Sequence, residues 1–286
     1  MKYLYFPGCS LKGTGKAYEE SLLAVFGALG VELQELEDWN CCGATAYMSV
    51  DETKSYALAG RILALAEREN LDVVAPCSAC YLVLNKTQKS LQEHPELHRK
   101  VTGALKAAGL DYKGTVKVRH PLDVLMNDVG LDAIKQKINS PMAGHKFAPY
   151  YGCQIVRPYA TFDDQHNPVT MDQILEASGA ECVDYPLKTR CCGGSLTGTV
   201  PEVGLRLAYI LIKEAKQRGA EAIVTVCPLC QFNLDGYQDA IAKKYERVDL
   251  PILYFTQILG LAMGLPAADL GFKRGIISAE AVLAGR

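Results

Sequence analysis

Ten of the eleven cysteines of this chain fall into two sets that repeat one order along the sequence. Each set has a single cysteine, then an adjacent Cys-Cys pair followed by glycine, then a C-x-x-C motif. The pair and the C-x-x-C are separated by 34 residues in both sets. The single cysteine and the pair are separated by 31 residues in the first set and by 37 in the second. Such a repeated spacing indicates an internal duplication. The first cysteine set is Cys9, Cys41, Cys42, Cys77 and Cys80, and the second cysteine set is Cys153, Cys191, Cys192, Cys227 and Cys230.

The similarity between the halves extends beyond the cysteines. Residues 72–77 align with 222–227, and residues 116–131 align with 250–265. A length of 286 residues is enough for two domains of ordinary size. The Pro- and Gly-containing stretch at 140–147 separates the repeats, so we expect one cysteine-rich domain at 1–143 and a second at 144–286.

Both halves alternate helix-like and strand-like segments. Residues 57–66 and 205–212 have apolar residues at helical spacing, and the short apolar runs 72–75 and 222–226 that follow them favour buried strands. We therefore predict an α/β protein of two similar halves related by a pseudo-twofold axis, each with a small, mostly parallel sheet flanked by helices. Both C-x-x-C motifs then lie at the carboxyl ends of strands, where open α/β sheets bind ligands.

Composition excludes several classes of function. Thirty basic and thirty-two acidic residues give a net charge of −2, which does not favour a general nucleic-acid binder. The N-terminal apolar run is too short for a secretion signal, and residues 251–267 contain polar residues, two glycines and a proline, so they predict a buried strand and helix instead of a transmembrane segment. We expect a cytoplasmic protein, in which cysteines favour metal binding or redox chemistry over structural disulfides.

Five cysteines in a set can be compared with the needs of each metal site. A C-x-x-C motif alone suits zinc, an iron–sulfur cluster or a redox dithiol. Zinc takes four ligands and has no redox chemistry, so it leaves one cysteine of each set unexplained. An iron–sulfur cluster also takes four thiolates, but it offers several irons to an adjacent Cys-Cys pair, and the fifth sulfur can bridge or face a substrate. The pattern therefore favours iron–sulfur clusters over zinc.

The doubled C-x31-CCG-x33-C-x-x-C and C-x37-CCG-x33-C-x-x-C pattern resembles the duplicated CCG domain of the heterodisulfide reductase B-subunit family, over the whole chain. The resemblance implies that each cysteine set binds a noncubane four-iron four-sulfur cluster. It also implies two partners, an iron–sulfur electron-donor protein of the heterodisulfide reductase C-subunit type and a flavin-containing protein of the A-subunit type. The chain lacks a full G-x-G-x-x-G or P-loop, so we expect no flavin or nucleotide on it.

The function implied by this resemblance is catalytic: reductive cleavage of a small-molecule disulfide, of the coenzyme M–coenzyme B type, to two thiols. The reaction takes two electrons, whereas one iron–sulfur centre normally passes one, so two centres suit it. Two alternatives stay open: a subunit of a related sulfur-oxidising or other CCG-domain oxidoreductase, and a non-catalytic subunit that only relays electrons.

Residues outside the two sets are candidates for weaker roles. His120 and His166 could protonate a leaving thiolate. A structural role is an equal alternative for His120, and a solvated loop histidine is the simpler interpretation of His166. The polar segment 161–168 is expected to form an active-site or partner-facing loop. Cys182 has no counterpart among the repeated cysteines and is expected to bind nothing. Four basic side chains close in sequence to the cysteines could hold an anionic substrate: Lys12, Arg157, Lys188 and Arg190.

Overall fold

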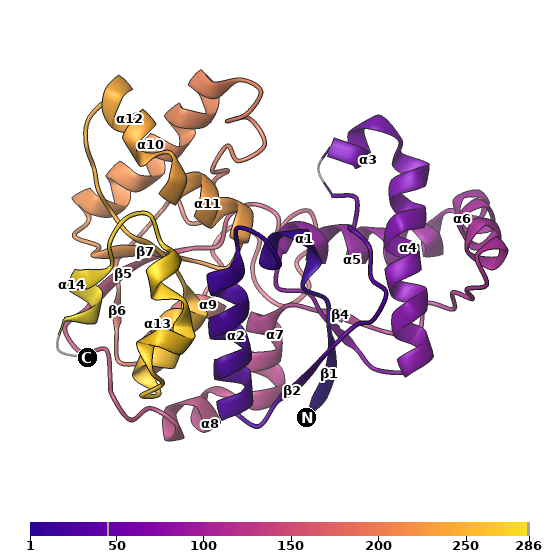
Figure 1. Cartoon of the computed structure of the whole chain (residues 1–286), viewed down its shortest axis with the longest axis horizontal. Helices are drawn as coiled ribbons and strands as arrows, with labels where there is room; N and C mark the ends of the chain where they lie inside the picture. The colour runs from indigo at the N-terminus through magenta and orange to yellow at the C-terminus, as the bar shows by residue number, and fades with distance from the viewer. Residues whose placement is uncertain (45, 285–286) are drawn as a thin grey trace. The chain divides into compact units, whose positions relative to one another are not determined.

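A computed structural model of the chain describes residues 1–44 and 46–284 and contains two four-stranded sheets (Figure 1). The first sheet has the order β2-β1-β3-β4 and consists of β1 (Lys2–Tyr5), β2 (Glu32–Glu35), β3 (Val73–Val74) and β4 (Val118–Arg119). The second has the order β6-β5-β7-β8 and consists of β5 (Lys146–Tyr150), β6 (Glu181–Cys182), β7 (Ala222–Thr225) and β8 (Ile252–Tyr254). All strand pairs are parallel. The shared order confirms the predicted α/β fold with an internal duplication.

Helices connect the strands in both halves. The first half has α1 (Gly8–Leu11), α2 (Lys16–Ala28), α3 (Ala46–Val50), α4 (Glu52–Glu69), α5 (Ser78–Glu93), α6 (Pro95–Ala107), α7 (Pro121–Val124), the π-helical η1 (Leu125–Val129) and α8 (Leu131–Gln136). The second has α9 (Thr170–Ala177), α10 (Pro201–Gln217), α11 (Pro228–Gly236), α12 (Gln238–Lys244), α13 (Phe255–Ala262), the 3₁₀ helices η2 (Ala267–Leu270) and η3 (Phe272–Arg274), and α14 (Glu280–Leu283).

The two segments predicted to be helical, 57–66 and 205–212, lie within α4 and α10. Capping residues and a proline determine where these two helices begin and end. The side chain of Asp51 accepts a hydrogen bond from the Lys54 backbone N–H at 3.0 Å and caps the start of α4. Asn70 ends the same helix in a left-handed conformation (φ 52°). Pro201 occupies the first turn of α10, where its missing N–H has no helical partner to lose.

The chain folds into two compact units that are not continuous in sequence. One unit contains Met1–Cys9 and Gly30–Pro121, and the other contains Ser10–Leu29 and Leu122–Arg286. Helix α2 therefore belongs to the second unit although it lies in the first sequence repeat. The domain boundary between residues 143 and 144 concerns the sequence repeat and stays a prediction.

Within the second unit, α2 packs against α13 (Figure 1). The Tyr18 and Tyr254 rings stack at 4.5 Å, and the hydroxyls of Ser21 and Thr256 share a buried hydrogen bond of 2.6 Å. Residues 252–262 form the strand β8 and the buried helix α13, as predicted. No helix within the described residues is long and apolar enough to cross a membrane.

The core of the second half joins its sheet to its cysteines. Buried residues of β5, β7 and β8 pack with α10 and with three cysteines of the second set: Cys192, Cys227 and Cys230. The second sheet therefore covers one side of these three thiols.

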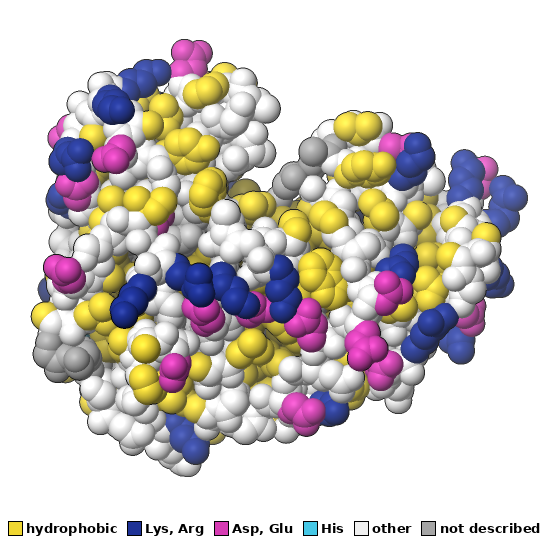
Figure 2. Space-filling model, in the orientation of Figure 1, with side chains coloured by type: hydrophobic (Ala, Val, Ile, Leu, Met, Phe, Trp, Pro, Cys, Tyr) yellow, Lys and Arg dark blue, Asp and Glu magenta, His cyan; other side chains and the backbone are white. Residues whose placement is uncertain are grey.

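On the surface, basic and acidic side chains are interspersed over the face drawn in Figure 2, in keeping with the small net charge.

Candidate metal centres

The first cysteine set occupies three connections that follow parallel strands. Cys9 lies in α1 directly after β1, Cys41 and Cys42 lie in the loop between β2 and α3, and Cys77 follows β3. Cys77 is the N-cap residue of α5, and Cys80 lies in the first turn of that helix. The carboxyl ends of neighbouring parallel strands meet at one edge of a sheet, which explains why residues so distant in sequence converge.

The second cysteine set repeats this arrangement. Cys153 lies in the turn after β5, Cys191 and Cys192 lie in the loop between β6 and α10, and Cys227 is the N-cap residue of α11. Cys230 lies in the first turn of α11. Both C-x-x-C motifs thus follow a strand and begin a helix, and the partial positive charge at such a helix end favours thiolate over thiol.

Contacts between thiols link several members of each set. The Sγ atoms of Cys42 and Cys80 are 3.2 Å apart, and those of Cys192 and Cys230 are 3.5 Å apart. Cys80 also contacts Cys77, and Cys230 also contacts Cys227. Of the accessible cysteines, Cys41 hydrogen-bonds the buried Cys42, and Cys153 and Cys191 hydrogen-bond each other. All eleven cysteines of the chain are outside disulfide bonds.

Each set has a buried side and an accessible side. Cys42, Cys77 and Cys80 are buried, whereas Cys9 and Cys41 are exposed. In the second set Cys192, Cys227 and Cys230 are buried, Cys191 is exposed and Cys153 is half-buried. A group held by either set would be enclosed by protein on one side and open on the other.

Glycine makes room for the buried sulfurs at matching positions of the two halves. Gly8 has a φ of +62°, and a Cβ added to it would lie 2.9 Å from the Sγ of Cys80. Gly152 has a φ of +72°, and its Cβ would lie 3.2 Å from the Sγ of Cys230. The residue before the first cysteine of each set is therefore glycine for both its backbone conformation and the space it leaves.

Neighbouring thiols and dipoles favour one thiolate in each set. Hydrogen bonds from Cys41 and Cys80 lower the pKa of Cys42 to about 4. A hydrogen bond from Cys153, the backbone N–H of Gly193 at 3.3 Å and the charge of Arg157 lower the pKa of Cys191 to about 6. The thiols that donate to these thiolates have raised pKa values: Cys41, Cys80 and Cys153.

These features fit an iron–sulfur cluster. Five sulfur donors, a thiolate favoured in each set, helix N-termini at both C-x-x-C motifs and glycines that make room for sulfur suit an anionic group with several metal ions. Among the residues described, no three His, Cys, Asp or Glu side chains converge as ligands of one metal ion. Thiol contacts instead join subsets of the cysteines within each set.

The two histidine candidates differ in their surroundings. His120 is completely buried, with its Nε2 3.2 Å from the carbonyl oxygen of Pro76 and its ring edge-on to Tyr81. It therefore packs behind the first C-x-x-C. His166 lies in the exposed loop 161–168, where its backbone N–H donates to Asp164 Oδ1 at 2.7 Å. Their proposed role as proton donors stays a prediction.

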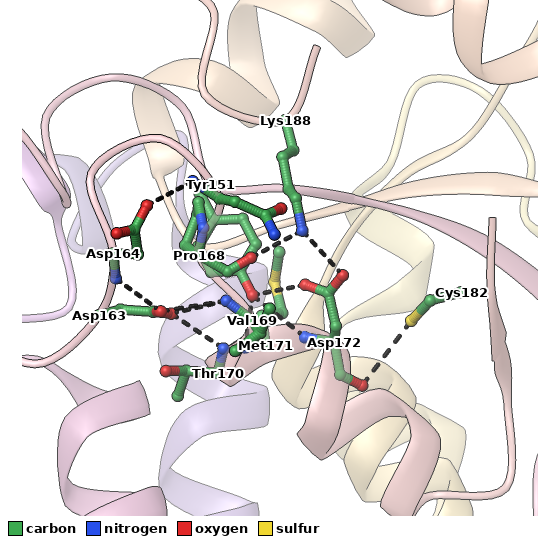
Figure 3. A network of polar contacts seen from close by, with 11 residues as sticks. Tyr151, Asp163, Asp164, Pro168, Val169, Thr170, Met171, Asp172, Cys182 and Lys188 are labelled. Atoms are coloured by element: carbon green, nitrogen blue, oxygen red, sulfur yellow. Dashed lines mark hydrogen bonds and ion pairs between the residues drawn. The ribbon is translucent and has the colours of Figure 1, made fainter. Parts of the chain in front are cut away.

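Lys188 belongs to a network of polar contacts in the second unit (Figure 3). Its Nζ donates to the carbonyl oxygen of Pro168 at 2.7 Å and to Asp172 Oδ1 at 3.1 Å. The Tyr151 hydroxyl donates to the other carboxylate oxygen of Asp172 at 2.5 Å, and the Lys188 ammonium lies over the Tyr151 ring. The Lys188 carbonyl accepts the backbone N–H groups of Tyr151 and Gly152. Lys188 thus joins the turn before Cys153 to the segment before Cys191.

We expect Lys188→Met to lower the free energy of unfolding by about 3 kcal/mol, because it leaves the Asp172 carboxylate largely buried without its cation. Urea denaturation of the anaerobically purified protein measures this. Lys146→Met is the matched control, since Lys146 forms an exposed ion pair with Glu181 and is expected to change stability by less than about 1 kcal/mol. Equal small effects of the two substitutions would show that the network does not stabilise this region.

The other basic candidates lie in distinct environments. Arg190 is exposed, and its carbonyl accepts a hydrogen bond from the Tyr150 hydroxyl at 2.6 Å. Lys12 and Lys16 form ion pairs with the buried Glu19; burial opposes ionisation of this carboxyl, but hydrogen bonds from the two lysines hold its pKa below the usual value. Arg157 donates from Nη2 to the carbonyl oxygen of Thr189, and its charge stabilises the Cys191 thiolate.

Cys182 lies in the edge strand β6. Its Sγ donates a long hydrogen bond of 3.7 Å to the carbonyl oxygen of Asp172, and burial raises its pKa to about 12. Its place in the sheet corresponds to that of Leu33 in β2, because Cys182 pairs with Phe147 of β5 and Leu33 pairs with the equivalent Tyr3 of β1. The expectation that it binds nothing stays a prediction.

Sequence reasoning missed the residues that support the second set from other elements. Asp172 and Tyr151 carry the polar network, and Gly204 of α10 lies against Gly193 of the second CCG motif. A doubled CCG motif does flag Gly193. No local signal distinguishes Asp172 from an ordinary helix-start carboxylate, or Gly204 from a weakness in a helix.

Comparison with known proteins places this geometry in a family. The CCG cysteine-rich domain matches the chain twice, over residues 3–85 and 147–235. The chain belongs to the CCG cysteine-rich domain family. Both matches contain a complete cysteine set, and the duplication seen in the two sheets is therefore the duplication of this domain.

Relatives of this CCG protein are subunits of oxidoreductases. It is 35% identical to a protein of Archaeoglobus profundus that is named as like the B subunit of heterodisulfide reductase, with 92% of this chain and 91% of the relative covered. It is 31% identical to the B subunit of the ferredoxin/F(420)H(2)-dependent CoB-CoM heterodisulfide reductase of Methanosarcina acetivorans (96% and 94% covered). It is 34% identical to the 8-methylmenaquinol:fumarate reductase membrane anchor subunit of Wolinella succinogenes (97% and 98% covered). The CCG protein is thus an iron–sulfur oxidoreductase subunit.

The fold is also found among solved structures. A hypothetical protein from Helicobacter pylori superposes with a TM-score of 0.77 at 15% sequence identity, and the match covers 97% of this chain and 52% of that one. At this identity the likeness concerns the fold alone.

Proposed function

We propose that the CCG protein is the disulfide-cleaving subunit of a heterodisulfide reductase-like complex. The observation that carries the proposal is the presence of two complete five-thiol sets, each buried on one side and accessible on the other. The relationship to heterodisulfide reductase B subunits at 31–35% identity supports it.

Each cysteine set would hold one noncubane four-iron four-sulfur cluster through its five thiolates. The bound clusters supply one-electron transfer, so two of them supply the two electrons that a disulfide takes up. The overall reaction is R–S–S–R′ plus two electrons and two protons, giving R–SH and R′–SH.

The protein's own residues prepare these sites in three ways. Cys42, Cys77 and Cys80, with their counterparts in the second half, keep water from the buried side of each site. Cys9, Cys41, Cys153 and Cys191 form the accessible side, where a substrate sulfur can approach. Arg157, held by the Thr189 carbonyl, places a positive charge beside Cys191 and favours an anionic substrate there.

The proposal includes two partner subunits and a location. One partner would be an iron–sulfur protein of the heterodisulfide reductase C-subunit type, which donates electrons to this chain. The other would be a flavin-containing protein of the A-subunit type. The relatives are named as subunits of reductases, which supports a multi-subunit complex. The cysteine content favours the cytoplasm, where thiols are kept reduced.

Anaerobic purification followed by iron and sulfide analysis tests the cofactor. About eight irons per chain are expected, on the basis of about four per cluster. In the same preparation, reduced protein is expected to cleave the coenzyme M–coenzyme B disulfide, and adding the disulfide is expected to change the EPR spectrum of the oxidised clusters. Protein that contains zinc alone would contradict the cofactor assignment, and unchanged spectra at both centres would favour an electron relay.

A second candidate is a subunit of a quinol-linked fumarate reductase. The relative from Wolinella succinogenes favours it, since it matches at 34% identity over nearly the full length of both chains. This candidate also predicts two clusters, but it predicts fumarate reduction by the purified native complex and no effect of disulfide on either EPR signal. The two assays in one preparation therefore separate the candidates.

A further inference from the structure

Thr225 is a buried polar residue next to the second cysteine set that the proposed function does not use. It is the last residue of β7, two residues before Cys227, and its side chain is completely buried. Its Oγ1 has no hydrogen-bond partner among the described residues. A buried hydroxyl left without a partner costs about 1–3 kcal/mol, and native proteins rarely leave one so.

The sheet register places Thr225 on the face that carries the thiols. Thr225 pairs with Tyr150 in the neighbouring parallel strand β5, so both side chains leave the sheet on the same side. Ile223, two residues earlier in β7, also lies on this side and packs in one core cluster with Tyr150, Cys192, Cys227 and Cys230.

Tyr150 confirms that this side of the sheet faces the second cysteine set. A Cβ on Gly152 would lie 3.8 Å from the Tyr150 ring and 3.2 Å from the Sγ of Cys230. Burial raises the pKa of Tyr150, and the charges of Cys230 and Cys192 raise it further. The Tyr150 hydroxyl is already used, because it donates to the carbonyl oxygen of Arg190. The hydroxyl of Thr225 is still available as a donor.

We propose that the Thr225 hydroxyl donates a hydrogen bond to a sulfur of the iron–sulfur cluster in the second cysteine set, and thereby raises the reduction potential of that cluster. Hydrogen bonds to cluster sulfurs are among the factors that set these potentials. The bond stabilises the reduced state more, because reduction adds negative charge to the sulfurs. This inference rests on the proposed function, which supplies a cluster in each set.

The first half lacks this donor. Residues 72–77 align with 222–227, so Ala75 occupies the position of Thr225. Ala75 is also completely buried, and its side chain has no hydroxyl. The two clusters therefore differ in a way that the shared cysteine pattern does not reveal: at this position only the second receives a side-chain donor.

The test is a redox titration of the anaerobically purified full-length protein, followed by EPR. The signal that is lost in Cys227→Ser is assigned to the second set. Thr225→Val, which keeps the shape and removes the hydroxyl, is expected to make reduction of the second centre about tenfold less favourable, a downward shift of about 59 mV, and to leave the first centre unchanged. Thr225→Ser retains the hydroxyl and is expected to restore most of the potential.

Equal shifts at both centres, or no shift at the second, would overturn the inference. If Thr225→Val does not fold, Ala75→Ser provides the reciprocal test, because a hydroxyl added in the first half should raise the potential of the first centre, and an unchanged potential would overturn the inference. The iron content distinguishes failure of the Thr225 inference from failure of the proposed function. Two clusters with unshifted potentials refute the role of Thr225 alone, whereas wild-type protein without iron refutes the proposed function as well.

Discussion

Cys227→Ser is expected to lower the iron content of the anaerobically purified protein from about eight to about four atoms per chain. Cys227 is buried at the start of α11 and contacts Cys230, so its thiolate belongs to the buried side of the second set. Serine keeps the volume but is not a thiolate donor, and the first set is complete without it. Iron analysis, with sulfide analysis of the same sample, measures the loss.

Cys182→Ser is the matched control for this experiment. It makes the same chemical change in the same half, at a cysteine whose pKa burial raises to about 12 and whose thiol contacts the carbonyl oxygen of Asp172. It is expected to retain about eight irons. Equal iron loss in the two variants would mean that the loss reflects unfolding and that the assignment of the second set is unsupported.

Gly204→Ala is expected to destabilise the protein by about 3 kcal/mol and to release the second cluster. Gly204 lies in α10, and a Cβ there would be 2.6 Å from Thr197 Cα and 2.7 Å from Thr197 N, while Gly193 of the CCG motif lies against its Cα. An added methyl group would therefore push the loop that carries Cys191 and Cys192 away from the helix. Urea denaturation and iron analysis of the same preparation measure both effects.

Gly103→Ala in α6 provides the control for helix propensity. No atom lies within 4 Å of a Cβ at this position, so alanine should stabilise the helix by up to about 1 kcal/mol. Opposite signs for the two substitutions would establish that the contact with the CCG loop, and not helix propensity, determines the effect at Gly204. A gain in stability at both positions would contradict the packing role.

The duplicated fold and the grouping of the cysteines could be predicted from the sequence because both depend on order and spacing. Parallel strands bring their carboxyl ends together whatever loops connect them, so cysteines that follow β1, β2 and β3 must converge. Helices α4 and α10 could be predicted because the helical spacing of apolar residues is a local pattern in the sequence.

The contacts that support the second cysteine set could not be predicted, because they join residues far apart in sequence and no local sequence pattern indicates which residues meet. The closeness of Lys188 to Cys191 in sequence suggests a substrate contact, but in the fold Lys188 forms an ion pair with Asp172, sixteen residues away. The orphaned hydroxyl of Thr225 is equally invisible, since threonine is an ordinary strand residue and only its three-dimensional surroundings reveal that its donor is unused.

Helix α2 has a consequence for how this protein can be divided. Its residues come from the first repeat, yet Tyr18 and Ser21 pack on Tyr254 and Thr256 in the second unit. Cutting the gene between the repeats would deprive α13 of this cover and expose a largely apolar helix to water. Although the chain arose by duplication, a helix of its first repeat completes the unit that the second repeat mainly forms, so the second repeat depends on being expressed together with the first.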